Sequence, residues 1–179
     1  MKIKLTPELT YLIGFWRKRR SPEGLGIYGE PQQLGLFTKE LLDMHITTTE
    51  KLISKEDMIY FYNTAYKKFF LEIEKEELER FKYLNEYAAN YLAGIFDSIG
   101  RIDEKGFVFI SKINSQDELL FLRLGFITKR VKDGIIFGKP RVFLAFIKNY
   151  VKIYAGHDAF KYVKTKGKNR VMNPHTNSA

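Results

Sequence analysis

Two carboxylates, Asp97 and Asp103, are the side chains whose type and position first suggest chemistry in this sequence. Carboxylates bind divalent cations and transfer protons. Asp97 stands in the segment YLAGIFDSIGRI, at 91–102, near the end of a predicted helix, where a cap or hydrogen-bond acceptor is the simpler interpretation. Asp103 and its neighbour Glu104 fall in a predicted hairpin turn, which is typically solvated. Asp97 and Asp103 are therefore reserve candidates for catalysis and no more.

The other residue types that carry chemistry form no recognisable site. His45, His157 and His175 are scattered and lack the spacing of metal ligands. The chain has no Cys, which excludes disulfides, thiolate metal sites and Cys nucleophiles. The glycines of GLGIYGEPQQLG, at 24–35, lack the preceding parallel strand and the following long helix of a nucleotide-binding loop. We therefore expect no metal and no cofactor.

The composition predicts a folded protein that does not cross a membrane. Hydrophobic residues make up 45% of the 179 residues and aromatic residues 15%, which is ample for a packed core. No apolar run approaches the roughly 20 residues that span a bilayer. The start, MKIKLTPELTYLIGF, lacks the small-residue cleavage site of a signal peptide. With no Cys, these features lead us to expect a cytoplasmic protein, and the frequent Lys, Glu, Ile and Tyr are typical of thermophiles.

The positive charge lies in the second half of the chain. The net charge is +9, but residues 1–98 carry 14 Lys/Arg against 15 Asp/Glu, a net of −1. Residues 99–179 carry 16 Lys/Arg against 6 Asp/Glu, a net of +10. Clustered cations favour a polyanion, because binding phosphates releases condensed counterions. We expect a nucleic-acid partner, and a basic thermophilic protein without a partner is the alternative.

Hydrophobic periodicity and turn signals predict elements along the whole chain. In the first part we expect a helix at 7–20, a strand at 24–29, a helix at 37–45, a hairpin at 51–62 and a helix at 63–82. In the second part we expect a helix at 83–98, a hairpin at 101–113, a helix at 114–124, a hairpin at 127–138 and a helix at 140–154.

A repeat relates the two parts. YLIGFW (11–16) and YLAGIF (91–96) align at an offset of 80 residues, with Tyr, Leu and Gly identical. Repeats of this kind indicate two similar halves related by a pseudo-twofold axis. Small residues allow two helix backbones to approach closely. We therefore expect a tight helix–helix interface built from Gly14, Ala89, Ala93, Gly94 and Ser98.

The segment YLAGIFDSIG resembles the signature of the LAGLIDADG homing endonucleases, and LTYLIGFWRKR resembles a degraded first copy. The resemblance implies an α+β fold of two pseudo-symmetric αββαββα halves, shaped as a saddle whose sheets lie in the DNA major groove. On this basis we divide the chain into a degenerate first half (1–82), a second half (83–157) and a basic C-terminal tail (158–179). A monomer with internal pseudo-twofold symmetry follows.

The resemblance also indicates that metal-dependent cleavage is lost. In the family, the eighth residue of the nine-residue motif is an acid that binds the divalent metal. Here the eighth positions hold Arg19 and Ile99, and neither side chain binds Mg²⁺. Asp97 occupies the sixth position, which is more often structural in the family. The sequence therefore predicts binding of RNA or double-stranded DNA without a catalytic residue, so we lean against an enzyme.

Two alternatives stay open. One is a homing endonuclease with an atypical site, which would make site-specific, Mg²⁺-dependent cuts in double-stranded DNA. The other is a protein-interaction module, with which the acid-rich segment LEIEKEELER at 71–80 is compatible, although a solvated helix face is equally so.

Nucleic-acid contacts are expected from cations at the end of the first signature helix, on the second-half hairpins and in the tail. Helix capping could also explain the first group, and solubility the last. The candidates are Arg17, Lys18, Arg19, Arg20, Lys112, Lys129, Arg130, Lys132, Lys139, Arg141, Lys164, Lys166, Lys168 and Arg170. The alternation in FVFISKI does not decide whether Phe107 and Phe109 or Val108 and Ile110 face the core. Exposed aromatic residues on a basic sheet would favour single-stranded nucleic acid.

Overall fold

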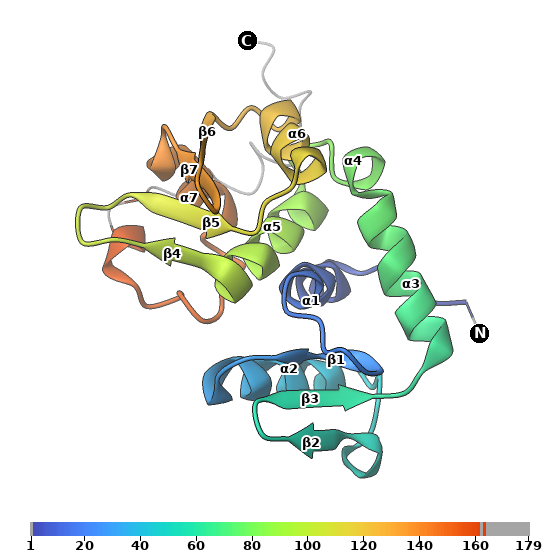
Figure 1. The fold of residues 1–179 in the computed structure, drawn as a ribbon. Helices are drawn as coiled ribbons and strands as arrows, with labels where there is room; N and C mark the ends of the chain where they lie inside the picture. Colours follow the sequence, from blue (N-terminus) through green and yellow to red (C-terminus); the bar gives the residue numbers. More distant parts are fainter. Residues whose placement is uncertain (1, 162, 164–179) are drawn as a thin grey trace.

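Seven α-helices and two antiparallel β-sheets make up the residues that the computed structural model describes, 2–161 and 163 (Figure 1). The expectation of an α+β fold is confirmed. The helices are α1 (Pro7–Arg17), α2 (Pro31–Asp43), α3 (Thr64–Lys75), α4 (Glu77–Arg80), α5 (Glu86–Ile99), α6 (Ser115–Arg123) and α7 (Pro140–Ile147). The strands are β1 (Leu25–Tyr28), β2 (Ile53–Lys55), β3 (Met58–Phe61), β4 (Gly100–Ile102), β5 (Val108–Ser111), β6 (Thr128–Val131) and β7 (Gly134–Phe137).

Side-chain caps fix where the two central helices begin. The Thr6 hydroxyl accepts a hydrogen bond from the Leu9 N–H at 3.2 Å, and Pro7 occupies the first turn of α1. The Asn85 side chain accepts from the Ala88 N–H at 3.0 Å at the start of α5. Such caps satisfy N–H groups that have no partner inside the helix. The caps therefore fix the first turns of α1 and α5.

The two sheets lie on different sides of α1, which Figure 1 shows nearly end-on between them. The first sheet has the order β1-β3-β2, and the second has the order β4-β5-β7-β6. Val108 and Ile110 are fully buried in the hydrophobic core, so Phe107 and Phe109 point to the outer face of the second sheet. Stacked Phe137 and Phe143 rings, with centroids 4.0 Å apart, lie at the centre of this core.

The first half has the expected element order. The second half follows helix, hairpin, helix, hairpin, helix from α5 to α7, whereas in the first half α1 is followed by one strand, β1, which forms an isolated antiparallel bridge with Arg20 through Ile27. The helix expected at 37–45 begins earlier, because Pro31 and a capping box between Glu30 and Gln33 start it. The last helix ends at Ile147 instead of 154. Two short 3-10 turns, Thr49–Lys51 and Asp158–Phe160, complete the described elements.

The α1 and α5 helices cross in close contact through glycine. A Cβ placed on Gly14 would lie 2.2 Å from the carbonyl oxygen of Tyr91, and one on Gly94 would lie 2.1 Å from that of Tyr11. The two contacts are reciprocal under the 80-residue offset. Ala89, Ala93 and Ser98 are buried on the same helix. The expected close crossing is present at Gly14 and Gly94, and the hydrogen bond from Arg19 to Ser98 shows that the C-terminal ends of the two helices meet.

Within the described part of the chain, no helix is long and apolar enough to cross a membrane.

Candidate nucleic-acid interface

The ends of α1 and α5 meet beside a hollow of about 320 Å³. The Arg19 Nε donates a hydrogen bond to the Ser98 carbonyl at 2.7 Å, so the second residue after α1 is joined to the end of α5. The carbonyl end of a helix carries partial negative charge, which stabilises a cation there. The hollow is lined by Arg19, Glu30, Gln32, Gln33, Asp97, Ser98, Ile99, Gly100, Arg101, Ser111, Lys112, Ile153 and Tyr154.

Three cations from separate parts of the chain line this hollow: Arg19, Arg101 and Lys112. The Arg19 guanidinium lies 5.9 Å from the centre of the Tyr28 ring, and Lys112 Nζ donates to the Tyr28 hydroxyl at 2.6 Å. Arg101 is exposed on β4. Lys112 adopts a left-handed backbone conformation, φ 55°, which is strained for a residue with a side chain, and its N–H donates to the Asp133 carbonyl at 2.8 Å. Cations held close together favour a bound anion.

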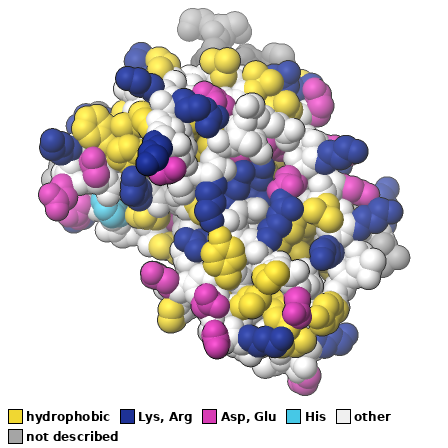
Figure 2. Space-filling model, in the orientation of Figure 1, with side chains coloured by type: hydrophobic (Ala, Val, Ile, Leu, Met, Phe, Trp, Pro, Cys, Tyr) yellow, Lys and Arg dark blue, Asp and Glu magenta, His cyan; other side chains and the backbone are white. Residues whose placement is uncertain are grey.

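A second hollow, of about 370 Å³, continues from the first across the outer face of the second sheet. Both hollows are lined by Ile99, Arg101 and Ser111. Lys132 and Asp133, in the β6–β7 turn, also line the second one. Figure 2 shows Lys and Arg side chains near the centre of this face and hydrophobic side chains over the second sheet. The two hollows together form the surface that we call the basic saddle.

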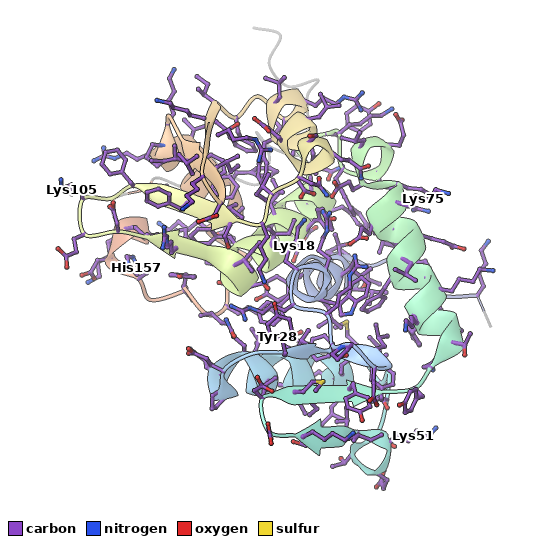
Figure 3. The ribbon with its side chains drawn as sticks, in the orientation of Figure 1. Lys18, Tyr28, Lys51, Lys75, Lys105 and His157 are labelled. Carbon is purple, nitrogen blue, oxygen red and sulfur yellow. The ribbon has the colours of Figure 1, made fainter. Side chains whose placement is uncertain are left out.

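Three of the four consecutive cations at 17–20 form ion pairs with acidic side chains. Arg17 is 5% exposed and forms ion pairs with Glu77 and Asp117, the latter at 2.7 Å. Lys18 Nζ lies 2.8 Å from Asp117, and Arg20 pairs with Glu74 while its guanidinium covers the Trp16 ring at 4.4 Å. The prediction of phosphate contact is therefore wrong for the buried Arg17. Among the described residues of this run, Arg19 is the member that reaches the hollow. In Figure 3 the label of Lys18 lies near the place where the ends of α1 and α5 meet.

A buried cluster of polar groups connects α1, α4, α5 and α6. Burial, together with the neighbouring Asp117, raises the pKa of Glu77 to about 7 against the opposing effect of Arg17. Burial also acts to raise the pKa of Asp117, but Arg17 and Lys18 outweigh it and lower that pKa. The Tyr91 hydroxyl donates to Glu77 at 2.6 Å. This polar cluster therefore fastens the two halves below the helix crossing.

Asp97 accepts hydrogen bonds from groups far along the chain. Its carboxylate accepts from the Tyr11 hydroxyl at 2.6 Å, and from the N–H groups of Lys152 at 2.6 Å, Ile153 at 3.2 Å and Tyr154 at 3.1 Å. Burial raises the pKa of Asp97, and these donors oppose that rise. The geometry agrees with the structural interpretation, since the oxygens are committed to holding the segment after α7.

Asp103, the other reserve candidate, lies at the tip of the β4–β5 hairpin. Its Oδ1 accepts from the N–H groups of Lys105 and Phe107, both at 2.9 Å. Such bonds are typical of an Asp that shapes a turn. Asp103 is therefore a turn residue outside the basic saddle.

The helix ends lack carboxylates at the two positions where the resemblance would place them. These positions hold a guanidinium, Arg19, and a buried aliphatic side chain, Ile99. Hard cations require oxygen ligands. Over residues 2–161 and 163, no group of three or more His, Asp or Glu side chains is placed to hold a metal ion.

The other cations predicted to contact nucleic acid lie at different places on the protein. Lys129, the register partner of Ile136, is on the outer face of the second sheet near the basic saddle. Arg130 faces the other way, where it pairs with Glu118 and donates to the Ile113 carbonyl at 3.1 Å. Two further candidates are exposed at the start of α7, at the opposite end of β7 from Lys132: Lys139 and Arg141. The tail candidates lie outside the described residues: Lys164, Lys166, Lys168 and Arg170.

Sequence reasoning missed Arg101. The side chains of Arg101 and Phe109 share a face, because the two residues are direct partners in the β4–β5 register. Alternation from Gly100, read together with that from Val108, could have identified Arg101 as outward-facing.

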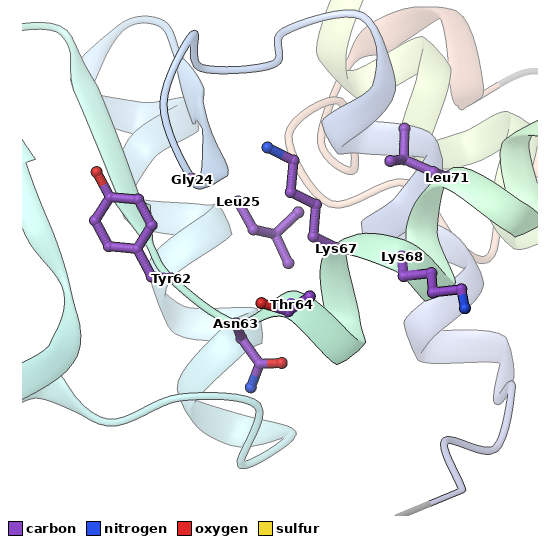
Figure 4. A pocket seen from close by; sticks show the side chains of 8 residues that line it. All are labelled: Gly24, Leu25, Tyr62, Asn63, Thr64, Lys67, Lys68 and Leu71. Carbon is purple, nitrogen blue, oxygen red and sulfur yellow. The ribbon is translucent and has the colours of Figure 1, made fainter.

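A third hollow, of about 390 Å³, lies at the start of α3 (Figure 4). Lys67 extends over it toward the loop of Gly24, and Lys68 also lines it. It adjoins the start of β1, whereas Tyr28, which contacts Arg19 and Lys112 of the basic saddle, lies at the other end of that strand. Its lysines provide a basic surface separate from the basic saddle.

Comparison of the sequence with protein-family models gives no match, and comparison with curated proteins gives none either.

Proposed function

We propose that this protein binds nucleic acid on the basic saddle and does not cut it, using a degenerate LAGLIDADG-like scaffold of two pseudo-symmetric halves. The observation that carries the proposal is the meeting of α1 and α5, whose reciprocal glycine contacts place Arg19 at the helix ends. In the family that the sequence resembles, this junction faces the nucleic-acid backbone. A monomer of 21.0 kDa follows, because the interface between halves lies within one chain.

Electrostatics supports a phosphate ligand. Arg19, Arg101 and Lys112 surround one hollow, and Lys132 lines the adjoining one. Each phosphate that such a cation neutralises releases condensed counterions. For duplex DNA, each such contact makes the slope of the logarithm of the binding constant against the logarithm of the salt concentration more negative by about 0.9. Four contacts would therefore give a slope of about −3.6. Glu30 and Asp133 also line the hollows, and they would disfavour phosphates at those edges.

The same positions argue against metal-dependent cleavage. Cleavage would require carboxylates that hold the metal beside the scissile phosphate. Arg19 instead places a positive charge at that point, which disfavours a cation and favours the phosphate itself. Asp97 is already engaged by four donors.

The test is an electrophoretic mobility shift with duplex DNA and with structured RNA, over a salt series, in Mg²⁺ and in EDTA. The proposal predicts salt-sensitive binding both in Mg²⁺ and in EDTA, with the nucleic acid intact on a denaturing gel. Specific products that require Mg²⁺ would support the homing endonuclease and overturn the proposal. Absence of binding to either nucleic acid at low salt would overturn it as well.

A further inference from the structure

The outer face of the second sheet combines apolar and cationic side chains. One row across the four strands contains Arg101, Phe109, Ile136 and Lys129, which are successive register partners. The Arg101 guanidinium lies 5.0 Å from the centre of the Phe109 ring. Phe107, next to this row, is 46% exposed. The centre of the face is therefore apolar and aromatic, and its two edges are cationic.

This face is poorly suited to reading a base-paired duplex. Sequence is read in the major groove by side chains that donate or accept hydrogen bonds. The central outward positions hold Phe107, Phe109 and Ile136, none of which can do so. Unpaired bases, by contrast, stack on aromatic rings and on Arg guanidinium planes.

A second copy of this chain is also a poor match. It would bring the same Arg101 and Lys129 against each other, and like charges facing across an interface oppose association. The cationic edges match an anionic backbone. Among nucleic acids, folded RNA is the one whose loops and bulges commonly leave bases unpaired.

We propose that the outer face of the β4-β5-β7-β6 sheet binds a single-stranded segment of RNA, whose bases stack on Phe107, Phe109 and the Arg101 guanidinium. The inference rests on the proposed function and specifies its ligand. Lys112 and Lys132, which line the adjoining hollows, lie where the RNA backbone leaves the sheet. The three gaps between four strands span about 14 Å, which accommodates two or three bases.

The first test measures binding of a fluorescein-labelled 12-nucleotide single-stranded RNA by anisotropy, with single-stranded DNA and duplex RNA of the same sequence as comparisons. Phe107→Ala together with Phe109→Ala is expected to weaken RNA binding by at least 10-fold, since base–aromatic stacks are lost. Phe109→Tyr, which keeps a ring, should retain binding. Tyr83→Ala is the matched control: Tyr83 is 64% exposed beside Lys82, 5.5 Å away, before the N-terminal end of α5, and its loss should leave binding unchanged.

A second measurement reports stacking directly and does not require a truncated side chain. Phe107→Trp places an indole at an exposed position, whereas the single natural Trp, Trp16, is 2% exposed in the core. Addition of the RNA should quench the new fluorescence, and a Tyr83→Trp protein should show no such change.

Each outcome decides the inference. Binding of RNA with no effect of the Phe variants and no quenching overturns it, as does preference for duplex RNA or single-stranded DNA over single-stranded RNA. Those results leave the proposed function intact. If the wild-type protein binds no nucleic acid at all, the proposed function fails with it.

Discussion

A single methyl group at the helix crossing should destabilise the protein. In Gly94→Ala, the new Cβ would stand 2.1 Å from the Tyr11 carbonyl oxygen and 2.8 Å from the Phe15 nitrogen. Ordinary contacts begin above 3 Å, so the helices must separate by about 1 Å, and the atoms in the way are backbone. Overpacking of this kind costs about 3 kcal/mol, and the better helix propensity of Ala returns about 1 kcal/mol. We expect a net loss of about 2 kcal/mol.

Gly35 provides the matched control within the same protein. It is an exposed residue of α2, and a Cβ built there has no neighbour within 4 Å. Gly35→Ala should therefore gain about 1 kcal/mol from helix propensity alone. The two variants should differ by about 3 kcal/mol in the free energy of unfolding, measured by urea denaturation with unchanged m-values.

The crossing also predicts non-additivity. Gly14→Ala should cost about as much as Gly94→Ala, because its Cβ would lie 2.2 Å from the Tyr91 carbonyl oxygen. One separation of the helices relieves both clashes, so the double variant should lose less than the sum of the single losses. A Gly94→Ala protein as stable as Gly35→Ala would refute the close approach of α1 and α5.

Three further predictions concern the buried polar groups. Burial raises the pKa of Glu77 from 4.5 to about 7. Between pH 7 and pH 4.5 the folded protein therefore binds a proton that the unfolded protein does not. The free energy of unfolding should rise by up to about 3 kcal/mol as the pH falls through this range. Glu77→Gln should remove that gain in melting temperatures measured between pH 5 and pH 8, and an unchanged profile would contradict it. Asp97→Ala should lower the free energy of unfolding, measured by urea denaturation, by more than about 3 kcal/mol, since four donors lose their acceptor. Asp97→Asn should lower it less, and equal losses would contradict a structural role for the Asp97 carboxylate. Arg17→Met leaves Glu77 and Asp117 buried without their shared cation and should cost about 3–5 kcal/mol, whereas Lys39→Met, which breaks an exposed pair with Asp43, should cost less than about 1 kcal/mol.

Local signals predicted most of the elements and the helix crossing. Hydrophobic periodicity and the Asp133-Gly134 turn predict the second half correctly from α5 to α7. The small residues Gly14 and Gly94 identify the crossing, because side-chain size alone decides how closely two helices approach. The strand expected at 24–29 is present as β1, but its antiparallel bridge to Arg20 was not predictable, because Arg20 lies in a run of cations with no strand pattern.

The candidate site was predictable only in part, because its electrostatics depends on contacts distant in sequence. The consecutive cations at 17–20 suggest one phosphate-binding group, yet Arg17 and Arg20 find partners in Glu74 and Glu77 of the acid-rich segment. That segment was interpreted as a solvated face or a docking surface. Which charges neutralise each other depends on how α3, α4 and α6 pack around α1, and neither run by itself carries that information.

The salt dependence of binding, measured for one pair of variants, tests the central claim most directly. Arg101→Ser together with Lys112→Ser removes two cations of the basic saddle, and Lys67→Ser together with Lys68→Ser removes two from the separate hollow at the start of α3. For the saddle variant, the slope of log K against log salt should become shallower by about 1.4 for single strands or 1.8 for duplex. For the α3 variant it should stay as in the wild-type protein. Equal slopes for the saddle variant and the wild-type protein would contradict the account.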